Sequence, residues 1–122
     1  MENFRDLQVW HKSHSLTLTC YQITCEFPKQ EMYGLSSQIC RCAASVAANL
    51  AEGCGKRGNG EFYRFLNVAL GSASELEYHF LLARDLKMIS EESYKNLDHR
   101  VVEIKRMLAS LACKVQSDRM QS

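Results

Sequence analysis

Residues that break helices are scarce in this sequence. It has one proline, Pro28, and six glycines, three of which fall between Gly53 and Gly58. The breakers are therefore concentrated in two places and leave long tracts uninterrupted, which favours helices over a fold of many short strands. We expect an all-α chain, and the length of 122 residues predicts a single domain spanning residues 1–122.

Signals for export, for membrane insertion and for disulfide or zinc chemistry are also missing. The N-terminus MENFRDLQVW has no basic and then apolar pattern, and no apolar run approaches the roughly 20 residues of a membrane span. None of the six cysteines forms a C-x-x-C pair, the spacing of zinc sites and thioredoxin-like motifs. We therefore expect a cytoplasmic protein with no membrane partner, whose cysteines stay reduced.

Apolar residues recur at steps of three and four in four segments. This pattern predicts helices over about residues 6–26, 34–53, 60–87 and 91–115. Pro28 should end the first helix, Asn59 should cap the third and Ser90 the fourth. Short connections predict an antiparallel, up-down-up-down four-helix bundle. The residues expected to face the core are Leu7, Trp10, Leu18, Tyr21 and Cys25 in the first helix, Leu35, Ile39, Cys42, Ala43, Val46 and Leu50 in the second, Phe62, Phe65, Leu66, Ala69, Ala73, Leu76, Phe80 and Ala83 in the third, and Tyr94, Leu97, Val101, Ile104, Leu108, Leu111 and Val115 in the fourth.

The glycine-rich segment Gly53–Gly58 matches the letters of the dinucleotide fingerprint G-x-G-x-x-G. That fingerprint works after a strand, whereas here it follows a predicted helix, so we interpret it as a helix end and a turn. Lys56 and Arg57 precede the next helix, whose free backbone amides attract anions. With Arg64 one to two turns further on, they are candidates for a nucleic-acid-binding patch.

Metal and catalytic patterns are weak. No glutamate has a histidine three residues later, as di-iron bundles require, and the Glu75/His79 pair has no second copy. Arg5 and His11 have the R-x4-6-H spacing typical of HEPN ribonucleases, but at the wrong end of the chain. We therefore expect no metal, no cofactor, no catalytic residues and no small-molecule substrate, with a bundle ribonuclease as the least favoured alternative.

Polar residues form a second stripe beside the apolar stripe of the second helix. They are Gln38, Arg41, Ser45, Asn49 and Glu52, and the third helix offers Ser72, Glu75 and His79 at comparable heights. Counted outward from the turn near Lys56, Arg41 falls about level with Ser72 and Glu75. We therefore expect an Arg41–Glu75 ion pair between the two helices. A network that fixes helix register is the first interpretation, a subunit contact the second, and a ligand site the third.

These motifs together resemble a known family. The chain is similar to the small four-helix bundle proteins encoded in intervening sequences of bacterial 23S ribosomal RNA genes, which are labelled S23-type, and to their relative, the accessory variability protein of diversity-generating retroelements. The matching residues, which extend over about residues 4–115, are Phe4, Leu7, Trp10, Phe27, Pro28, Glu31, Gly34, Leu35, Gln38, Ile39, Arg41, Ala43, Ala44, Ser45, Val46, Asn49, Ala51, Glu52, Gly53, Phe65, Leu66, Ala69, Gly71, Ser72, Glu75 and Leu76.

The resemblance implies a non-catalytic bundle that assembles into a ring, typically a homopentamer, and for the retroelement relative it implies binding to nucleic acid. RNA or DNA is accordingly the candidate partner of this chain besides its own copies. The retroelement relatives are markedly basic and bind a reverse transcriptase, which leaves that role as the alternative for a chain of net charge +1. Residues we expect to matter for fold and assembly are Trp10, Arg41, Asn49, Glu52, Gly71 and Glu75. The candidate nucleic-acid residues are Lys56, Arg57 and Arg64.

Overall fold

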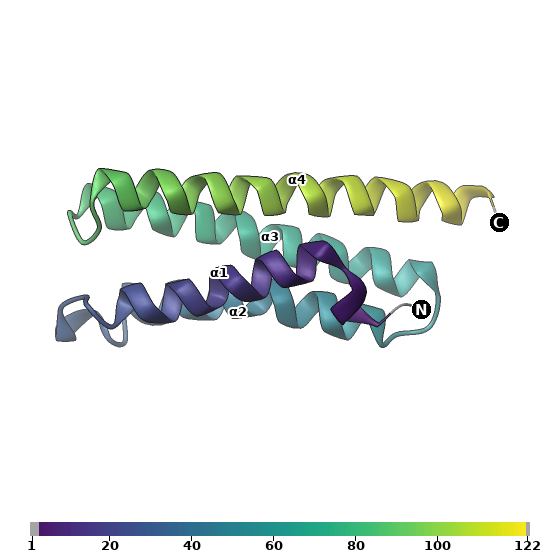
Figure 1. Cartoon of the computed structure of the whole chain (residues 1–122). Helices are drawn as coiled ribbons and strands as arrows, with labels where there is room; N and C mark the ends of the chain where they lie inside the picture. Colours follow the sequence, from purple (N-terminus) through teal and green to yellow (C-terminus); the bar gives the residue numbers. More distant parts are fainter. Residues whose placement is uncertain (1–2, 122) are drawn as a thin grey trace.

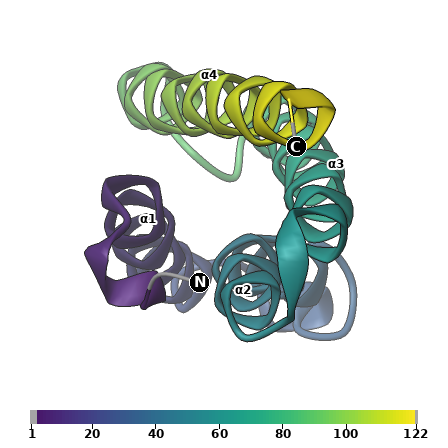
Figure 2. The same cartoon turned by 90° about the vertical axis from the view of Figure 1, so that its right-hand side faces the viewer.

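The protein is built from helices. The computed structural model describes residues 3–121 and contains four α-helices, α1 (Gln8–Thr24), α2 (Leu35–Cys54), α3 (Gly58–Asp85) and α4 (Glu91–Gln121), with two short 3-10 helices, η1 (Phe4–Asp6) and η2 (Lys29–Glu31). No strand occurs within residues 3–121. The α-helices lie lengthwise beside one another (Figure 1). Seen from the end, they follow in the order α1, α2, α3, α4 around the bundle (Figure 2). The helices and the absence of strands in residues 3–121 confirm the all-α prediction.

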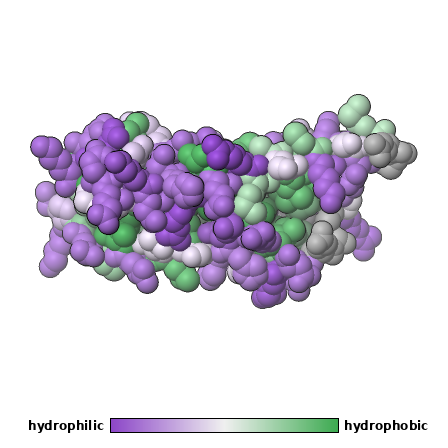
Figure 3. All heavy atoms as spheres, turned by 45° about the horizontal axis from the view of Figure 1, so that its top comes forward, coloured by the Kyte–Doolittle hydropathy of each residue, from purple (hydrophilic) through white to green (hydrophobic). Residues whose placement is uncertain are grey.

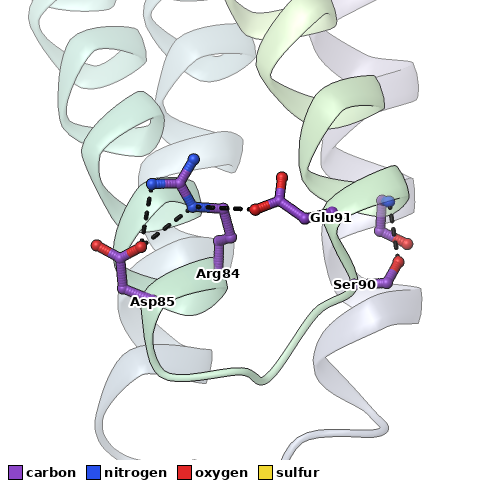
Figure 4. A network of polar contacts seen from close by, with 5 residues as sticks. Arg84, Asp85, Ser90 and Glu91 are labelled. Carbon is purple, nitrogen blue, oxygen red and sulfur yellow. Dashed lines mark hydrogen bonds and ion pairs between the residues drawn. The ribbon is translucent and has the colours of Figure 1, made fainter.

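Each of the three connections between the α-helices contains a residue that favours a helix end or a helix start. Helix α1 ends at Thr24, before Pro28, which has φ −54° and ψ 142° and lies directly before η2. Gly58 opens α3 with a φ of +80°, a left-handed value that glycine adopts without a steric cost. Ser90 caps α4 as predicted, because its Oγ accepts a hydrogen bond of 3.0 Å from the backbone N–H of Ser93. Arg84 adds charge contacts with Asp85 and Glu91 across the same turn (Figure 4).

The core stripes predicted for the second and third helices are confirmed in full. Every residue of both sets is buried, with Leu50, Ala69 and Phe80 at 0% exposure. In α4 the predicted seam is buried at Leu97, Val101, Ile104, Leu108 and Val115 and half-buried at its two remaining positions. Steps of three and four therefore identified the inward faces of α2, α3 and α4.

The stripe predicted for the first helix is correct only at its start. Leu7 and Trp10 are half-buried and pack against the core, whereas Leu18, Tyr21 and Cys25 are exposed, so the prediction is wrong for these three. Leu18 and Tyr21 are each 52% exposed, and the buried residues of α1 are Val9, Ser13, Leu16, Thr17 and Cys20. The hydroxyls can be buried because each donates to a backbone carbonyl, that of Ser13 to Val9 O at 2.7 Å and that of Thr17 to Ser13 O at 2.8 Å. The inward face of α1 thus combines Val9, Leu16 and Cys20 with two hydroxyl residues, while Leu18 and Tyr21 stay on the surface.

Two helix ends differ from the prediction. The N-cap position of α3 is Arg57 and not Asn59, and no side chain caps it. Helix α4 continues to Gln121, whereas the sequence predicted an end near Val115. The extension is held by contact with α3, because the Arg119 guanidinium lies 5.6 Å from the centroid of the Tyr63 ring.

The packing of α1 against α4 is the loosest of the contacts between neighbouring helices. Lys12 forms an ion pair of 3.2 Å with Glu103, and Arg100 donates to the hydroxyls of Thr19 and Ser15. In Figure 3, hydrophobic side chains show among hydrophilic ones in the half of the molecule where α4 ends. No described helix is both long enough and apolar enough to cross a membrane.

Gly53 supplies a test of how closely α2 and α3 approach each other. A Cβ at this position would lie 2.9 Å from Phe65 Cβ and 3.1 Å from Phe62 Cδ1. Gly53→Ala should therefore lower the free energy of unfolding by about 1–3 kcal/mol, the usual cost of overpacking a core. Chemical denaturation followed by circular dichroism measures this change.

Gly55→Ala is the matched control, because the nearest atom to its added methyl would be a carbonyl oxygen at 3.5 Å. That variant should stay within about 0.5 kcal/mol of the parent protein. Equal reductions in stability in both variants would contradict the close approach at Gly53.

Candidate assembly and nucleic-acid surfaces

The polar stripes of α2 and α3 face each other, as predicted. Ser45 Oγ lies 2.9 Å from Ser72 Oγ across the two helices. Asn49 Nδ2 donates to the backbone carbonyl of Ser45 at 2.8 Å and to its Oγ at 2.9 Å. All three residues are half-buried, so these bonds satisfy groups that water reaches poorly. The contact between Ser45 and Ser72 is the one of these bonds that crosses between the two helices, and the role of the seam in fixing their register stays a prediction.

The expected Arg41–Glu75 ion pair does not form in the described part of the chain. Glu75 Oε2 pairs with His79 Nε2 at 3.2 Å, one turn further along α3. Arg41 is exposed on α2. A partner at i+4 on the same helix needs no long side chain to cross between helices, which explains why His79 takes the carboxylate.

Cys42 joins Glu75 and His79 from the neighbouring helix. A ligand atom from each of the three side chains lies within 4.8 Å of the others. Burial, together with the adjacent Glu75 carboxylate, raises the pKa of the Cys42 thiol to about 12. The thiol and the His79 ring in turn hold the pKa of Glu75 below its usual value. The sequence pattern placed Cys42 in the apolar stripe and gave no sign that it meets a carboxylate and an imidazole.

A cavity of about 310 Å³ opens beside this cluster, at the seam between α2 and α3. Cys42 and Glu75 form part of its wall, and the wall is completed by Gln38, Arg41, Ser45 and Ser72. A separate cavity of about 340 Å³ lies between α1 and α4 and shares no lining residue with the first cavity. The seam therefore offers a polar space that solvent or a small ion can enter.

The candidate nucleic-acid residues gather where α2 passes into α3. Lys56, Arg57 and Arg64 are all exposed. Arg64 forms an ion pair of 3.2 Å with Glu61 and lies 4.5 Å from the centroid of the Phe65 ring. The same pairing lowers the pKa of Glu61. The local cation excess is therefore smaller than the sequence suggested, although Lys56 and Arg57 keep their positions before the first turn of α3.

Arg119 is a basic residue of this surface that sequence analysis missed. A methyl group at Gly60 would lie 3.7 Å from its guanidinium, which places Arg119 beside the first turn of α3. The predicted end of the fourth helix near Val115 hid this contact. A helix about 9 Å longer, at 1.5 Å per residue, is what carries the side chain there.

The remaining assembly candidates are scattered. Trp10 is half-buried and stacks on His14 at 4.9 Å between ring centroids, with Phe4 at 4.8 Å. Glu52 is exposed. Gly71 is exposed in the middle of α3, and a Cβ built there meets nothing within 4 Å. Their roles in assembly stay predictions.

The motifs that resemble enzyme signatures are committed to local structure. His11 Nε2 donates to the backbone carbonyl of Arg5 at 2.6 Å, while the Arg5 guanidinium lies over the Phe4 ring at 4.4 Å. Both residues are exposed, and His11 also lines the cavity between α1 and α4. Gly53 belongs to α2 and Gly58 to α3, so the glycine pattern links two helices and follows no strand.

Comparisons with known proteins agree with the helical architecture. A crystal structure of a protein with unknown function from the S23 ribosomal protein family of Bacteroides thetaiotaomicron is similar, with 28% identity and a TM-score of 0.77, over 85% of this chain and 97% of that one. No curated protein matches the chain. A family model described as 23S rRNA-intervening sequence protein matches residues 5–110. The chain therefore belongs to the family of 23S rRNA-intervening sequence proteins.

Proposed function

We propose that this protein is a non-catalytic scaffold, an up-down-up-down four-helix bundle whose copies assemble into a ring, with five copies as the expected number, and which associates with RNA. The observation that carries the proposal is an outward-facing strip on α3. Val68, Gly71, Glu75 and Tyr78 follow one another at steps of three, four and three and are all exposed. Such spacing places them on one face of the helix.

Gly71 is the residue of this strip that favours a close approach of a second copy. Glycine inside a helix costs about 0.5–1 kcal/mol relative to alanine. Gly53 offsets that cost by admitting the Phe62 and Phe65 side chains, whereas a Cβ built at Gly71 meets no neighbouring atom of the described residues within 4 Å. A second copy that approaches closely at Gly71 supplies the missing reason. Val68, 43% exposed, and Tyr78, 56% exposed, are then shielded from water in the assembly.

A second apolar surface lies on a different helix. Leu18 and Tyr21 on α1 are each 52% exposed, and Tyr33, in the connection to α2, is 92% exposed. Two different surfaces with exposed apolar residues suit a head-to-tail contact, in which α3 of one copy packs against α1 of the next. Contacts of this kind close into rings when the rotation between copies permits.

The RNA part of the proposal rests on the surface around Lys56 and Arg57. Both residues are exposed and stand next to the N-terminus of α3, whose backbone amides and dipole favour phosphate. The family description refers to 23S rRNA, and the similar solved structure carries the S23 ribosomal protein name. A ring repeats this basic surface around its axis, so several weak sites act on one RNA.

Self-association is tested by light scattering on the full chain. At micromolar concentration the mass should be a multiple of 13.9 kDa, and five copies give five times 13.9, about 70 kDa. Gly71→Arg should shift the mass toward that of one chain, because a large charged side chain blocks the outward strip of α3 without a clash inside the subunit.

Asn96→Arg, at an exposed position of α4, is the control for adding the same charge and should keep the assembled mass. Circular dichroism confirms that each variant is folded. A parent protein that stays at 13.9 kDa under these conditions would rule out the ring.

RNA binding is tested by titrating structured RNA at about 50 and 200 mM salt, since neutralised phosphates make affinity fall with salt. Lys56→Gln combined with Arg57→Gln should weaken binding on all RNA sequences alike. It should also reduce the slope of log affinity against log salt by about two, because each of the two cations neutralises one phosphate.

The control pair Lys29→Gln and Lys95→Gln removes the same charge from exposed positions in η2 and early α4, away from the start of α3. It should leave the slope unchanged. Equal effects of the two pairs, or no binding even at low salt, would count against this surface.

A further inference from the structure

We propose that Cys42, Glu75 and His79 form a binding site for a zinc ion that bridges α2 and α3. Cys42 comes from α2, and Glu75 and His79 come from successive turns of α3. Their ligand atoms lie within 4.8 Å of one another, and the contact between Glu75 Oε2 and His79 Nε2 is 3.2 Å. Neighbouring ligands of a tetrahedral zinc ion are about 3–4 Å apart, as bond lengths of about 2.0 Å to N or O and about 2.3 Å to S require. Small side-chain adjustments therefore bring all three to bonding distance.

The types of ligand select the metal. A thiolate and an imidazole are soft or borderline ligands that zinc prefers, whereas magnesium and calcium take oxygen ligands. Binding exchanges the thiol proton of Cys42 for the metal ion and releases that proton to solvent. One thiolate and one carboxylate then balance the two positive charges of the ion, so the filled site is neutral.

The surroundings of the site favour occupation. The imidazole nitrogen that faces the Glu75 carboxylate is Nε2, so Nε2 is the atom that takes the ion. The ring proton then resides on Nδ1, a buried atom without a hydrogen-bond partner among the described residues. The cavity of about 310 Å³ that Cys42 and Glu75 help to line gives a water molecule access to the fourth coordination position. Three protein ligands and one water form the open arrangement of zinc sites that are not purely structural.

All three ligands come from one chain, so the ion needs neither a partner subunit nor RNA to bind, although Glu75 also belongs to the outward strip of α3. A bound ion would tie the middle of α2 to the second half of α3, close to the hydrogen bond between Ser45 and Ser72. A metal that binds the folded state only also raises thermal stability by mass action. Stability and spectroscopy therefore report on the same site independently.

The test uses Co²⁺ and Zn²⁺ on the full-length protein under reducing conditions. Co²⁺ should give a thiolate-to-metal charge-transfer band and the intense visible bands of a tetrahedral ion, and Zn²⁺ should remove them by displacement. Zn²⁺ alone should raise the melting temperature. Cys42→Ala should abolish the charge-transfer band. Glu75→Gln, at an exposed side chain that leaves the core intact, should weaken Co²⁺ binding at least about tenfold, since even the removal of a group behind a ligand costs about 10- to 100-fold.

Cys113→Ala and His99→Gln are the controls, because both side chains are exposed on α4 and removing them should leave the spectrum unchanged. Circular dichroism shows whether Cys42→Ala folds, and Glu75→Gln decides the matter if it does not. A Co²⁺ spectrum that stays octahedral, a band that survives in Cys42→Ala, or equal affinity in Glu75→Gln would overturn the proposal.

Discussion

The close packing of α2 against α3 is the contact on which the other features of the structure depend. Gly53 leaves room for Phe62 and Phe65 of α3, and the small residues Ala69 and Ala73 of α3 are fully buried. Small side chains let two helix backbones approach, and dense packing then fixes their relative height. The polar seam between these helices exists because they are this close. Separating them by one methyl group at Gly53 would disturb both the core and the seam.

Periodicity in the sequence predicted the inward faces of three helices because apolar residues alone cover those faces. It failed for most of α1, where Ser13 and Thr17 lie inside and Leu18 and Tyr21 lie outside. A hydroxyl that bonds the carbonyl four residues earlier satisfies its polarity within its own helix. Counting serine and threonine as polar interrupts the inward stripe at these two positions, so the pattern favoured Leu18 and Tyr21 instead. The same error concealed the exposed apolar residues Leu18 and Tyr21 on α1.

The candidate sites show a similar division. The sequence indicated that the polar stripes of α2 and α3 face each other, and Ser45 and Ser72 do meet. It could not decide the partner of Glu75, because that choice turns on a few ångströms of side-chain reach and His79 on the same helix is nearer than Arg41. Cys42 was hidden for another reason. A thiol counts as a small apolar residue until a carboxylate and an imidazole from another helix are seen beside it.

The net charge of the chain does not predict where basic residues gather on its surface. The chain carries +1 overall, yet the start of α3 brings Lys56 and Arg57 together, and the full length of α4 delivers Arg119 to the same turn. Arg64 is paired with Glu61, but an exposed pair is worth little, so the acid limits the field without removing the cation from reach. In the ring that we propose, each copy would present this cluster at the same height. The field toward the proposed RNA partner would then depend on how the fold places the charges and on how often symmetry repeats them.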